Sequence, residues 1–175
     1  QAAIEALLTR KPISLTSFDS RSLRSAVEAL LERHAIDTIY VFSSQMAQYL
    51  PARPRQKVIM DFVDMDSAKF AAYAKEGRGP MAWVMQREAR LLFQYERAIA
   101  ARADASLFVS EAEAQLFRER SGAERVHVVE NGIDTDVFAP DASFKQIEAI
   151  DALVVFTGQM DYRPNIEAVS WFVEA

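Results

Sequence analysis

The sequence has 175 residues, of which half are hydrophobic, and a formal charge of −5 from 20 basic and 25 acidic side chains. This composition is typical of a globular protein, and the acidic balance argues against a nucleic-acid partner. The absence of cysteine excludes disulfides, thiol catalysis and Cys-ligated zinc, and the two histidines lie too far apart in sequence to indicate a metal site.

Strand and helix patterns alternate along the chain. Runs of β-branched and aromatic residues predict strands at 36–42, 57–63, 105–109 and 126–129, and a further strand at 153–157. Helical spacing of apolar residues predicts helices at 23–33, 44–49, 67–75, 81–103 and 111–120, and one that opens near Pro164. This alternation predicts the α/β class, with a Rossmann-like, doubly wound parallel sheet.

The same patterns suggest a domain organisation. We predict a domain over residues 1–138, a linker over 139–152, and the start of a second domain over 153–175. The first residues lack a signal-peptide pattern, and no run of about 18 apolar residues predicts a membrane span. The last residues stop inside an apolar helical pattern, so we expect a fragment of a longer protein that lacks the opening strand of its first domain.

Polar residues follow the predicted strands, and ligands of open α/β sheets bind beyond the carboxyl ends of strands. They are Ser43, Ser44, Asp64, Asp66, Ser67, Ser110, Glu111, Asn131, Gly132 and Asp134. Taken singly, each is also explained as a helix cap or a turn residue. Ser110 and Glu113 have capping-box spacing, Asp66 or Ser67 could cap the next helix, and Asn131-Gly132 is a turn signal because both residues tolerate positive φ.

The segment Asp64-Met65-Asp66-Ser67 is the most distinctive local motif. Its carboxylates could accept hydrogen bonds from sugar hydroxyls, or stabilise positive charge that develops at an anomeric carbon. A rival interpretation is the Asp-x-Asp motif of haloacid-dehalogenase phosphotransferases, in which the first Asp is the nucleophile. Ser67 departs from that motif, and no paired acidic motif follows downstream.

The helix predicted at 81–103 suggests a basic stripe formed by Arg87, Arg90, Arg97 and Arg102. Such a stripe could contact an anionic membrane surface, although a solvated helix face is the simpler explanation. We expect the aromatic residues of this helix, Trp83, Phe93 and Tyr95, to lie in the core.

Two blocks then carry a resemblance. Residues 128–140 match an "NG-D---F-P" pattern and residues 153–165 an "F-G-MDY-PN" pattern, in this order. Both resemble the hinge of GT-B glycosyltransferases of family 4. The stretches 39–49, 61–67, 95–98 and 108–113 resemble the branch of that family associated with exopolysaccharide and PEP-CTERM sorting systems in Gram-negative bacteria.

The resemblance implies an enzyme that transfers a sugar from a nucleotide-sugar donor to a glycan or lipid-linked acceptor. It implies retention of anomeric configuration, no bound metal and no cofactor, in the bacterial cytoplasm or at the inner face of the membrane. The acceptor would meet Ser43, Ser44, Asp64, Asp66, Ser67, Ser110 and Glu111, with Asp64 the catalytic candidate. The donor would meet Asn131, Gly132, Asp134, Gly158, Asp161 and Arg163.

Departures from the family pattern qualify these expectations. Gln159 and Asn165 stand near positions where many relatives carry phosphate-binding basic residues, and the chain ends before the carboxylate motif of the donor domain. We therefore expect the fragment itself to be inactive, and an exposed strand at 153–157 could pair two copies into a dimer. The alternative is a non-catalytic Rossmann-like carbohydrate-binding or regulatory module, which a downstream Glu-x7-Glu pattern would exclude.

Overall fold

The computed structural model describes residues 11–139 and 153–174. The chain divides into two compact units, Gln1–Gly132 and Ile133–Ala175, which we call unit 1 and unit 2. Each is described separately below. The predicted linker 139–152 lies, apart from its first residue, outside the described residues.

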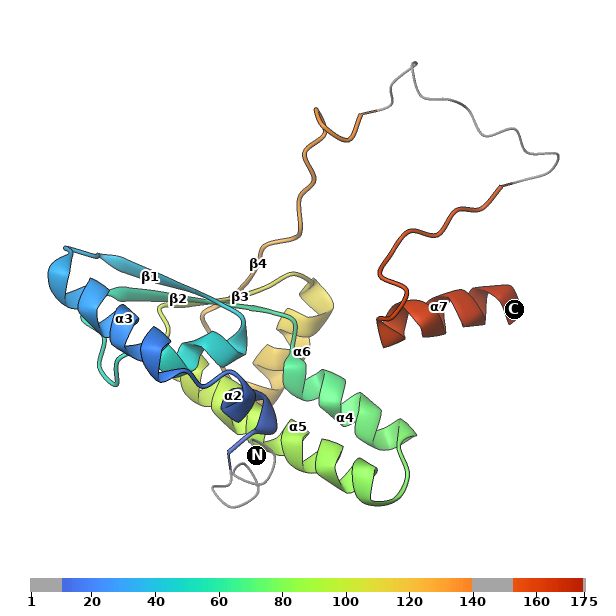
Figure 1. Ribbon diagram of the computed structural model, residues 1–175, viewed down its shortest axis with the longest axis horizontal. Helices are drawn as coiled ribbons and strands as arrows, with labels where there is room; N and C mark the ends of the chain where they lie inside the picture. The colour runs from blue at the N-terminus through green and yellow to red at the C-terminus, as the bar shows by residue number, and fades with distance from the viewer. Residues whose placement is uncertain (1–10, 140–152, 175) are drawn as a thin grey trace. The chain divides into compact units, whose positions relative to one another are not determined.

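Unit 1 contains a four-stranded parallel sheet whose strands follow one another in chain order (Figure 1). The strands are β1 (Thr38–Phe42), β2 (Lys57–Val63), β3 (Ala105–Phe108) and β4 (Val126–Val128). Among its described residues, unit 1 has the helices α2 (Ile13–Ser17), α3 (Arg21–Arg33), the 3₁₀ helix η1 (Ser44–Tyr49), α4 (Asp66–Glu76), α5 (Gly79–Arg102) and α6 (Glu111–Ser121). Parallel strands joined by helices confirm the predicted α/β, Rossmann-like class.

One face of the sheet forms the core. In β2, buried Val58, Met60 and Phe62 alternate with residues that keep partial exposure, as expected for a strand with period two. These side chains pack in one cluster with residues of α5 and α6, among them Ile99 and Phe117. The Phe62 ring stacks on Phe108 with a centroid separation of 5.2 Å, so the core is continuous across neighbouring strands.

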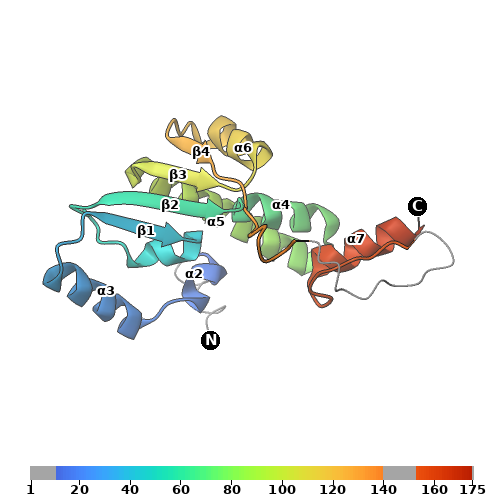
Figure 2. The same cartoon turned by 90° about the horizontal axis from the view of Figure 1, so that it is seen from above.

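The opposite face of the sheet has much less cover. Tyr40 is 56% exposed and Phe42 61% exposed. In Figure 2 the strands of unit 1 lie in front of α5, and no labelled helix of unit 1 crosses them. Parallel sheets are normally covered by helices on both faces. The described residues supply the helical layer on the core face and little cover on the other.

Most predicted elements of unit 1 are confirmed within a few residues, but two details of capping are wrong. The residue before α4 is Met65, and no side chain caps this helix, so neither Asp66 nor Ser67 is the cap. The segment after β1 is a 3₁₀ helix, and the Ser43 side chain bonds to Gln45 instead of capping it. In both cases the polar side chain has a partner elsewhere in the fold.

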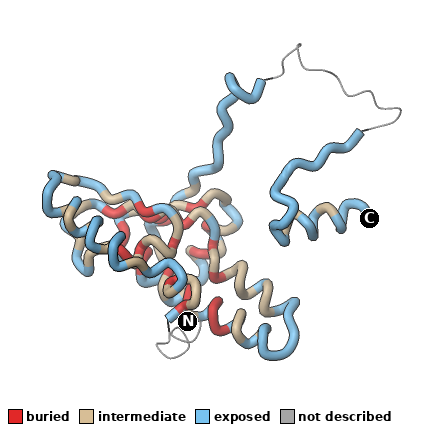
Figure 3. The backbone as a smooth tube through the Cα atoms, viewed as in Figure 1, coloured by how far each residue is buried: buried red, intermediate tan, exposed pale blue. Residues whose placement is uncertain are grey.

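Unit 2 contains α7 (Arg163–Glu174), which confirms the helix predicted near Pro164. The predicted strand at 153–157 is wrong, because these residues adopt no strand pairing. Phe156 is 44% exposed and Val154 68% exposed, and Figure 3 draws the described part of unit 2 almost entirely as exposed. An extended apolar segment becomes a strand only when a neighbour accepts its backbone hydrogen bonds.

Candidate functional site

The carboxyl ends of β1 and β2 carry unusual backbone geometry. Among the described residues, Ser43 (φ 71°) and Val63 (φ 66°) are the two non-glycine residues with positive φ. A β-branched residue such as Val63 is strongly disfavoured there, and strain of this kind concentrates at functional sites. Hydrogen bonds between strands hold both residues: Ser43 N donates to Asp61 O (2.8 Å), and Val109 N donates to Val63 O (3.0 Å). The sheet therefore fixes this edge in a strained form.

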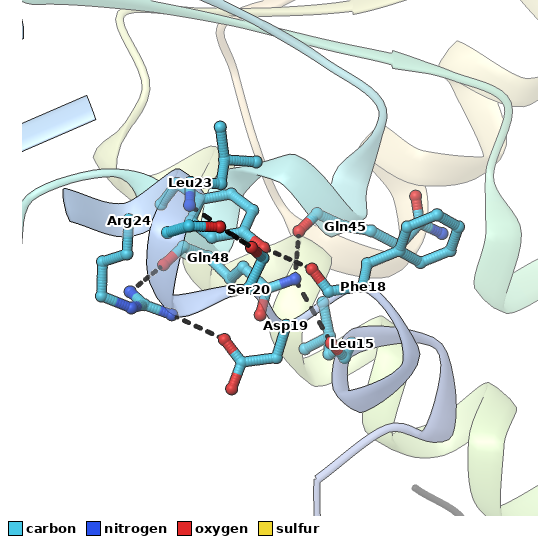
Figure 4. A network of polar contacts seen from close by, with 10 residues as sticks. Leu15, Phe18, Asp19, Ser20, Leu23, Arg24, Gln45 and Gln48 are labelled. Atoms are coloured by element: carbon cyan, nitrogen blue, oxygen red, sulfur yellow. Dashed lines mark hydrogen bonds and ion pairs between the residues drawn. The ribbon is translucent and has the colours of Figure 1, made fainter. Parts of the chain in front are cut away.

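The helix η1, which carries Ser44 and Gln45, is held against α2 and α3 (Figure 4). Gln48 Nε2 donates to Leu15 O (3.3 Å) and to Gln45 O (2.9 Å). Arg24 donates from Nη1 to Gln48 O (2.8 Å) and pairs through Nη2 with Asp19 (3.2 Å). These contacts connect the end of β1 to elements that precede it in the chain.

The loop after β2, Asp64 to Ser67, is held by carboxylates from two helices. Met65 N donates to Glu113 Oε1 of α6 (3.0 Å). Ser67 donates from its backbone N to Glu96 Oε1 (3.0 Å) and from its hydroxyl to Glu96 Oε2 of α5 (2.6 Å). Ser67 and Glu96 are each 1% exposed, so this hydroxyl is turned into the protein and away from any ligand.

Asp66 joins the same loop to η1. Its Oδ2 accepts hydrogen bonds from Ser44 Oγ (3.1 Å) and from Gln45 Nε2 (2.8 Å). Ser44 is fully buried, so its hydroxyl also supports the loop instead of facing solvent. The structure thus brings the predicted residues Ser44, Asp66 and Ser67 together, in contacts with protein groups.

Asp64 differs from its neighbours because it is exposed. Partial burial raises the pKa of its carboxyl group; Glu113 and Asp66 raise it further, and Lys69 opposes them. A carboxylate with a raised pKa is a better proton acceptor than a free one. Asp64 is therefore the member of this loop whose geometry suits contact with a ligand.

At the start of α6, the predicted capping box is confirmed. Ser110 Oγ accepts from Glu113 N (3.3 Å) and donates to Glu113 Oε2 (3.2 Å). Since the other Glu113 oxygen holds Met65 N, this one side chain connects the ends of β2 and β3. Glu111 is exposed and pairs with Arg118 at 2.7 Å.

Several residues of this edge carried no signal that singled them out in the sequence. Glu96 stood inside a helical pattern and Gln45 inside a short helix, and neither position marks a site. Asp61 had a weak signal: it is a polar residue inside the apolar run that follows Lys57 in this strand. Its Oδ1 accepts from Val63 N (3.0 Å) and its Oδ2 accepts a hydrogen bond from the Tyr40 hydroxyl, which raises the pKa of the tyrosine.

The segment after β4 contains predicted donor residues of both units. In unit 1, neither Asn131 nor Gly132 lies in a turn or has positive φ, so the turn predicted at Asn131-Gly132 is wrong. In unit 2, a turn forms at Asp134, whose Oδ1 accepts from Asp136 N (3.0 Å) and Val137 N (3.1 Å). The aspartate side chain replaces the glycine as the turn-forming element.

The remaining predicted donor residues lie in unit 2. A Cβ at Gly158 would lie 2.9 Å from Asn165 Nδ2, so a larger residue there would displace the Asn165 side chain within the unit itself. Arg163 pairs with Glu167 at 2.5 Å, and Asp161 is exposed. No contact in the described residues groups Gly158, Asp161 and Arg163 into a single site, and their donor role stays a prediction.

Two expectations for α5 are wrong. Arg87 is only 9% exposed and donates to Lys11 O (3.3 Å), so it leaves the predicted basic stripe, whereas Arg90, Arg97 and Arg102 are exposed. Trp83 is 62% exposed and is not in the core. Tyr95 is partly buried, and its hydroxyl has no hydrogen-bond partner among the described residues.

Two further findings apply to the described ranges. Residues 11–139 and 153–174 contain no group of three or more His, Cys, Asp or Glu side chains arranged to hold a metal ion. No helix in the same ranges is both long and apolar enough to cross a membrane.

The sequence was compared with known proteins. The family model described as Glycosyltransferase Family 4 matches residues 8–137, which is most of the chain and includes every strand of the sheet. The chain belongs to glycosyltransferase family 4. No curated protein and no solved structure matched it. The family match supports a sugar transferase and gives no support to the phosphotransferase interpretation of Asp64.

Proposed function

We propose that this chain is the acceptor-side part of a retaining GT-B glycosyltransferase. The enzyme would transfer a sugar from a nucleotide-sugar to a glycan or lipid-linked acceptor in bacterial exopolysaccharide synthesis, at the cytoplasmic face of the membrane. The observation that carries the proposal is the exposed Asp64 carboxylate, on a loop whose Met65 and Ser67 amides are held by carboxylates of α6 and α5, at the carboxyl edge of a family 4 sheet.

The charge of this edge favours an acceptor over a donor. Glu113 of α6 and Asp66 lie close enough to Asp64 for their charges to raise the pKa of its carboxyl group. A diphosphate would be repelled by these carboxylates, whereas sugar hydroxyls donate hydrogen bonds to them. The donor would accordingly bind elsewhere, and the expected residues for it remain Asn131, Gly132, Asp134, Gly158, Asp161 and Arg163.

In this proposal Asp64 orients the acceptor. Its carboxylate accepts a hydrogen bond from the acceptor hydroxyl and directs the oxygen toward the anomeric carbon. Its negative charge also favours the positive charge that develops on the sugar as the bond to the diphosphate breaks. A single fixed carboxylate on the acceptor side suffices for both effects, without a metal ion or cofactor.

The test is turnover of the full-length protein with Asp64→Asn, which keeps the shape of the side chain and removes its charge. Nucleoside diphosphate release is measured over a panel of nucleotide sugars, with a lipid extract as acceptor. We expect release with one donor in the wild type, and a kcat lower by about 100-fold in the variant, because the acceptor loses its orientation.

The matched control is Asp37→Asn, since Asp37 is an exposed carboxylate just before β1, at the amino end of the sheet. It should keep wild-type turnover. Equal turnover of wild type and Asp64→Asn would show that Asp64 has no role in the reaction, while the protein would still be a glycosyltransferase. A folded wild type that releases nothing from any donor would favour the non-catalytic carbohydrate-binding or regulatory module.

A further inference from the structure

Four described helices of unit 1 begin without a side-chain cap of their own, and two of them, α2 and α4, receive hydrogen bonds from another helix instead. α2 follows Pro12 and α4 follows Met65. The first turn of a helix has free backbone N–H groups, which need acceptors when they are buried. The acceptors for these two helices therefore come from another part of the fold.

Both come from α5. Glu88 accepts hydrogen bonds from Ile13 N (2.8 Å), Ser14 N (2.9 Å) and the Ser14 hydroxyl (2.9 Å) at the start of α2. Glu96 accepts from Ser67 N (3.0 Å) and from the Ser67 hydroxyl (2.6 Å) at the start of α4. Glu88 is 2% exposed and Glu96 1% exposed. One helix thus caps two others with buried carboxylates, each bound to a backbone amide and a serine hydroxyl.

The two caps differ in what they hold. Glu88 fixes a short helix near the amino end of the described chain, whereas Glu96 fixes the residue three positions after Asp64. With Met65 N bound to Glu113, Glu96 completes the support of the loop on both sides of Asp66. The direction of the exposed Asp64 carboxylate depends on these bonds, because it lies next to the residues that they fix.

We propose that Glu96 is a positioning residue for Asp64. Its ionised form fixes the loop Asp64 to Ser67 in the geometry that binds the acceptor, and its protonated form binds this loop less tightly. The inference rests on the proposed function, since Asp64 is taken to orient the acceptor. It adds that protonation of a side chain that touches no substrate controls the conformation of the acceptor site.

The hydrogen bonds between Glu96 and Ser67 explain why protonation of Glu96 affects the loop. Ionised Glu96 accepts from both Ser67 donors and places negative charge at the start of α4, where the helix dipole favours it. Once protonated, it loses that charge, and one oxygen must donate, so Ser67 Oγ has to turn from donor to acceptor. The hold on the loop weakens when the proton binds.

The surroundings of Glu96 put this change near neutral pH. Burial raises its pKa to about 7, Asp66 of α4 raises it as well, and the two Ser67 hydrogen bonds and Arg120 of α6 oppose the rise. Glu113 of α6 and Lys69 of α4 interact electrostatically with Asp64 in the same loop. A modest change of pH around neutrality therefore changes the charge of Glu96.

The experiment is the pH profile of kcat/KM for the full-length protein between pH 5.5 and 8.5. In the wild type we expect activity to rise with pH around a midpoint of about 7. Glu96→Gln keeps the side-chain shape but cannot ionise, so its activity should stay near the low-pH level of the wild type and lose this rise. Ser67→Ala removes a bond that lowers the pKa of Glu96, so the midpoint should move upward.

Glu88→Gln is the matched control, because it alters the same kind of buried cap on the same helix, and it should keep the wild-type midpoint. An unchanged midpoint in Glu96→Gln, or a flat wild-type profile, overturns the inference. If the wild type shows no turnover at all, it is the proposed function that fails.

Hydrogen exchange provides a readout that does not depend on turnover. The Ser67 amide of the full-length wild type, corrected for intrinsic exchange and measured relative to core amides of β2 that report global opening, should be better protected at pH 8 than at pH 6. In Glu96→Gln the two values should agree. Equal protection of the wild-type amide at both pH values overturns the inference, even in an active enzyme, and the same measurement shows whether the variant is folded.

Discussion

The strand–helix segment 105–121 of unit 1 and the segment 153–174 of unit 2 have the same sequence plan, yet only the first forms both elements. Each has an apolar run, a polar loop and an amphipathic helix. In unit 1 the run becomes β3, paired on both sides, and Phe108 is 1% exposed. In unit 2 the run stays unpaired, and Phe156 is 44% exposed. A helix satisfies its own backbone, whereas a strand needs neighbours.

The largest expected effect comes from removing the two aromatic rings. Phe108→Ala should lower the free energy of unfolding by about 3–5 kcal/mol, because it leaves a cavity beside Phe62 and Phe117. Phe156→Ala should cost about 1 kcal/mol or less, because nearly half of the residue is exposed. Urea unfolding followed by circular dichroism measures both. Equal losses would mean that Phe156 belongs to a core like that of β3.

The next effect is a difference between the units in how their stability depends on pH. Every described carboxyl group of unit 2 is exposed, whereas Glu96 of unit 1 is buried with its pKa raised to about 7. A raised folded-state pKa gives stability that is fully present below the unfolded-state value and is lost as pH rises through the folded-state value. Between about pH 4.5 and 8 the wild type should lose about 3 kcal/mol that Glu96→Gln retains.

Denaturant titrations at several pH values test that expectation. Glu96→Gln should be the more stable protein at pH 8, and the two curves should converge toward pH 5. Parallel curves would show that Glu96 titrates alike in the folded and unfolded states. The stability gained by the variant at pH 8 would accompany its loss of activity, so the buried charge is a cost to the fold that serves the site.

The smallest expected effect is the loss of stability when either of two glycines is replaced by alanine. Gly122 ends α6 with φ 71°, so Gly122→Ala should cost about 1–2 kcal/mol of unfolding free energy. Gly132 has no positive φ and open space around its Cα, so Gly132→Ala should change stability by less than about 0.5 kcal/mol. The same unfolding titrations apply. A larger loss at Gly132 would restore the turn predicted at Asn131-Gly132.

The candidate site was only partly predictable from the sequence. The edge of the sheet could be located, because polar residues that follow parallel strands meet there, and Asp64 was among them. The supporting residues could not be found, because Glu96 lies 29 positions from Ser67 and Glu113 lies 48 from Met65. Long-range contacts of this kind leave no periodic trace in a sequence.

The sequence alone determined most elements of unit 1, though not the short helix α2, and the capping box at Ser110, because propensity, periodicity and capping act over a few neighbouring residues. The tertiary structure decided which apolar run became a strand. It also turned the hydroxyls of Ser44 and Ser67 inward and left Asp64 exposed. Those outcomes depend on which distant groups are near enough to accept a hydrogen bond or exclude water, and only the folded chain sets that proximity.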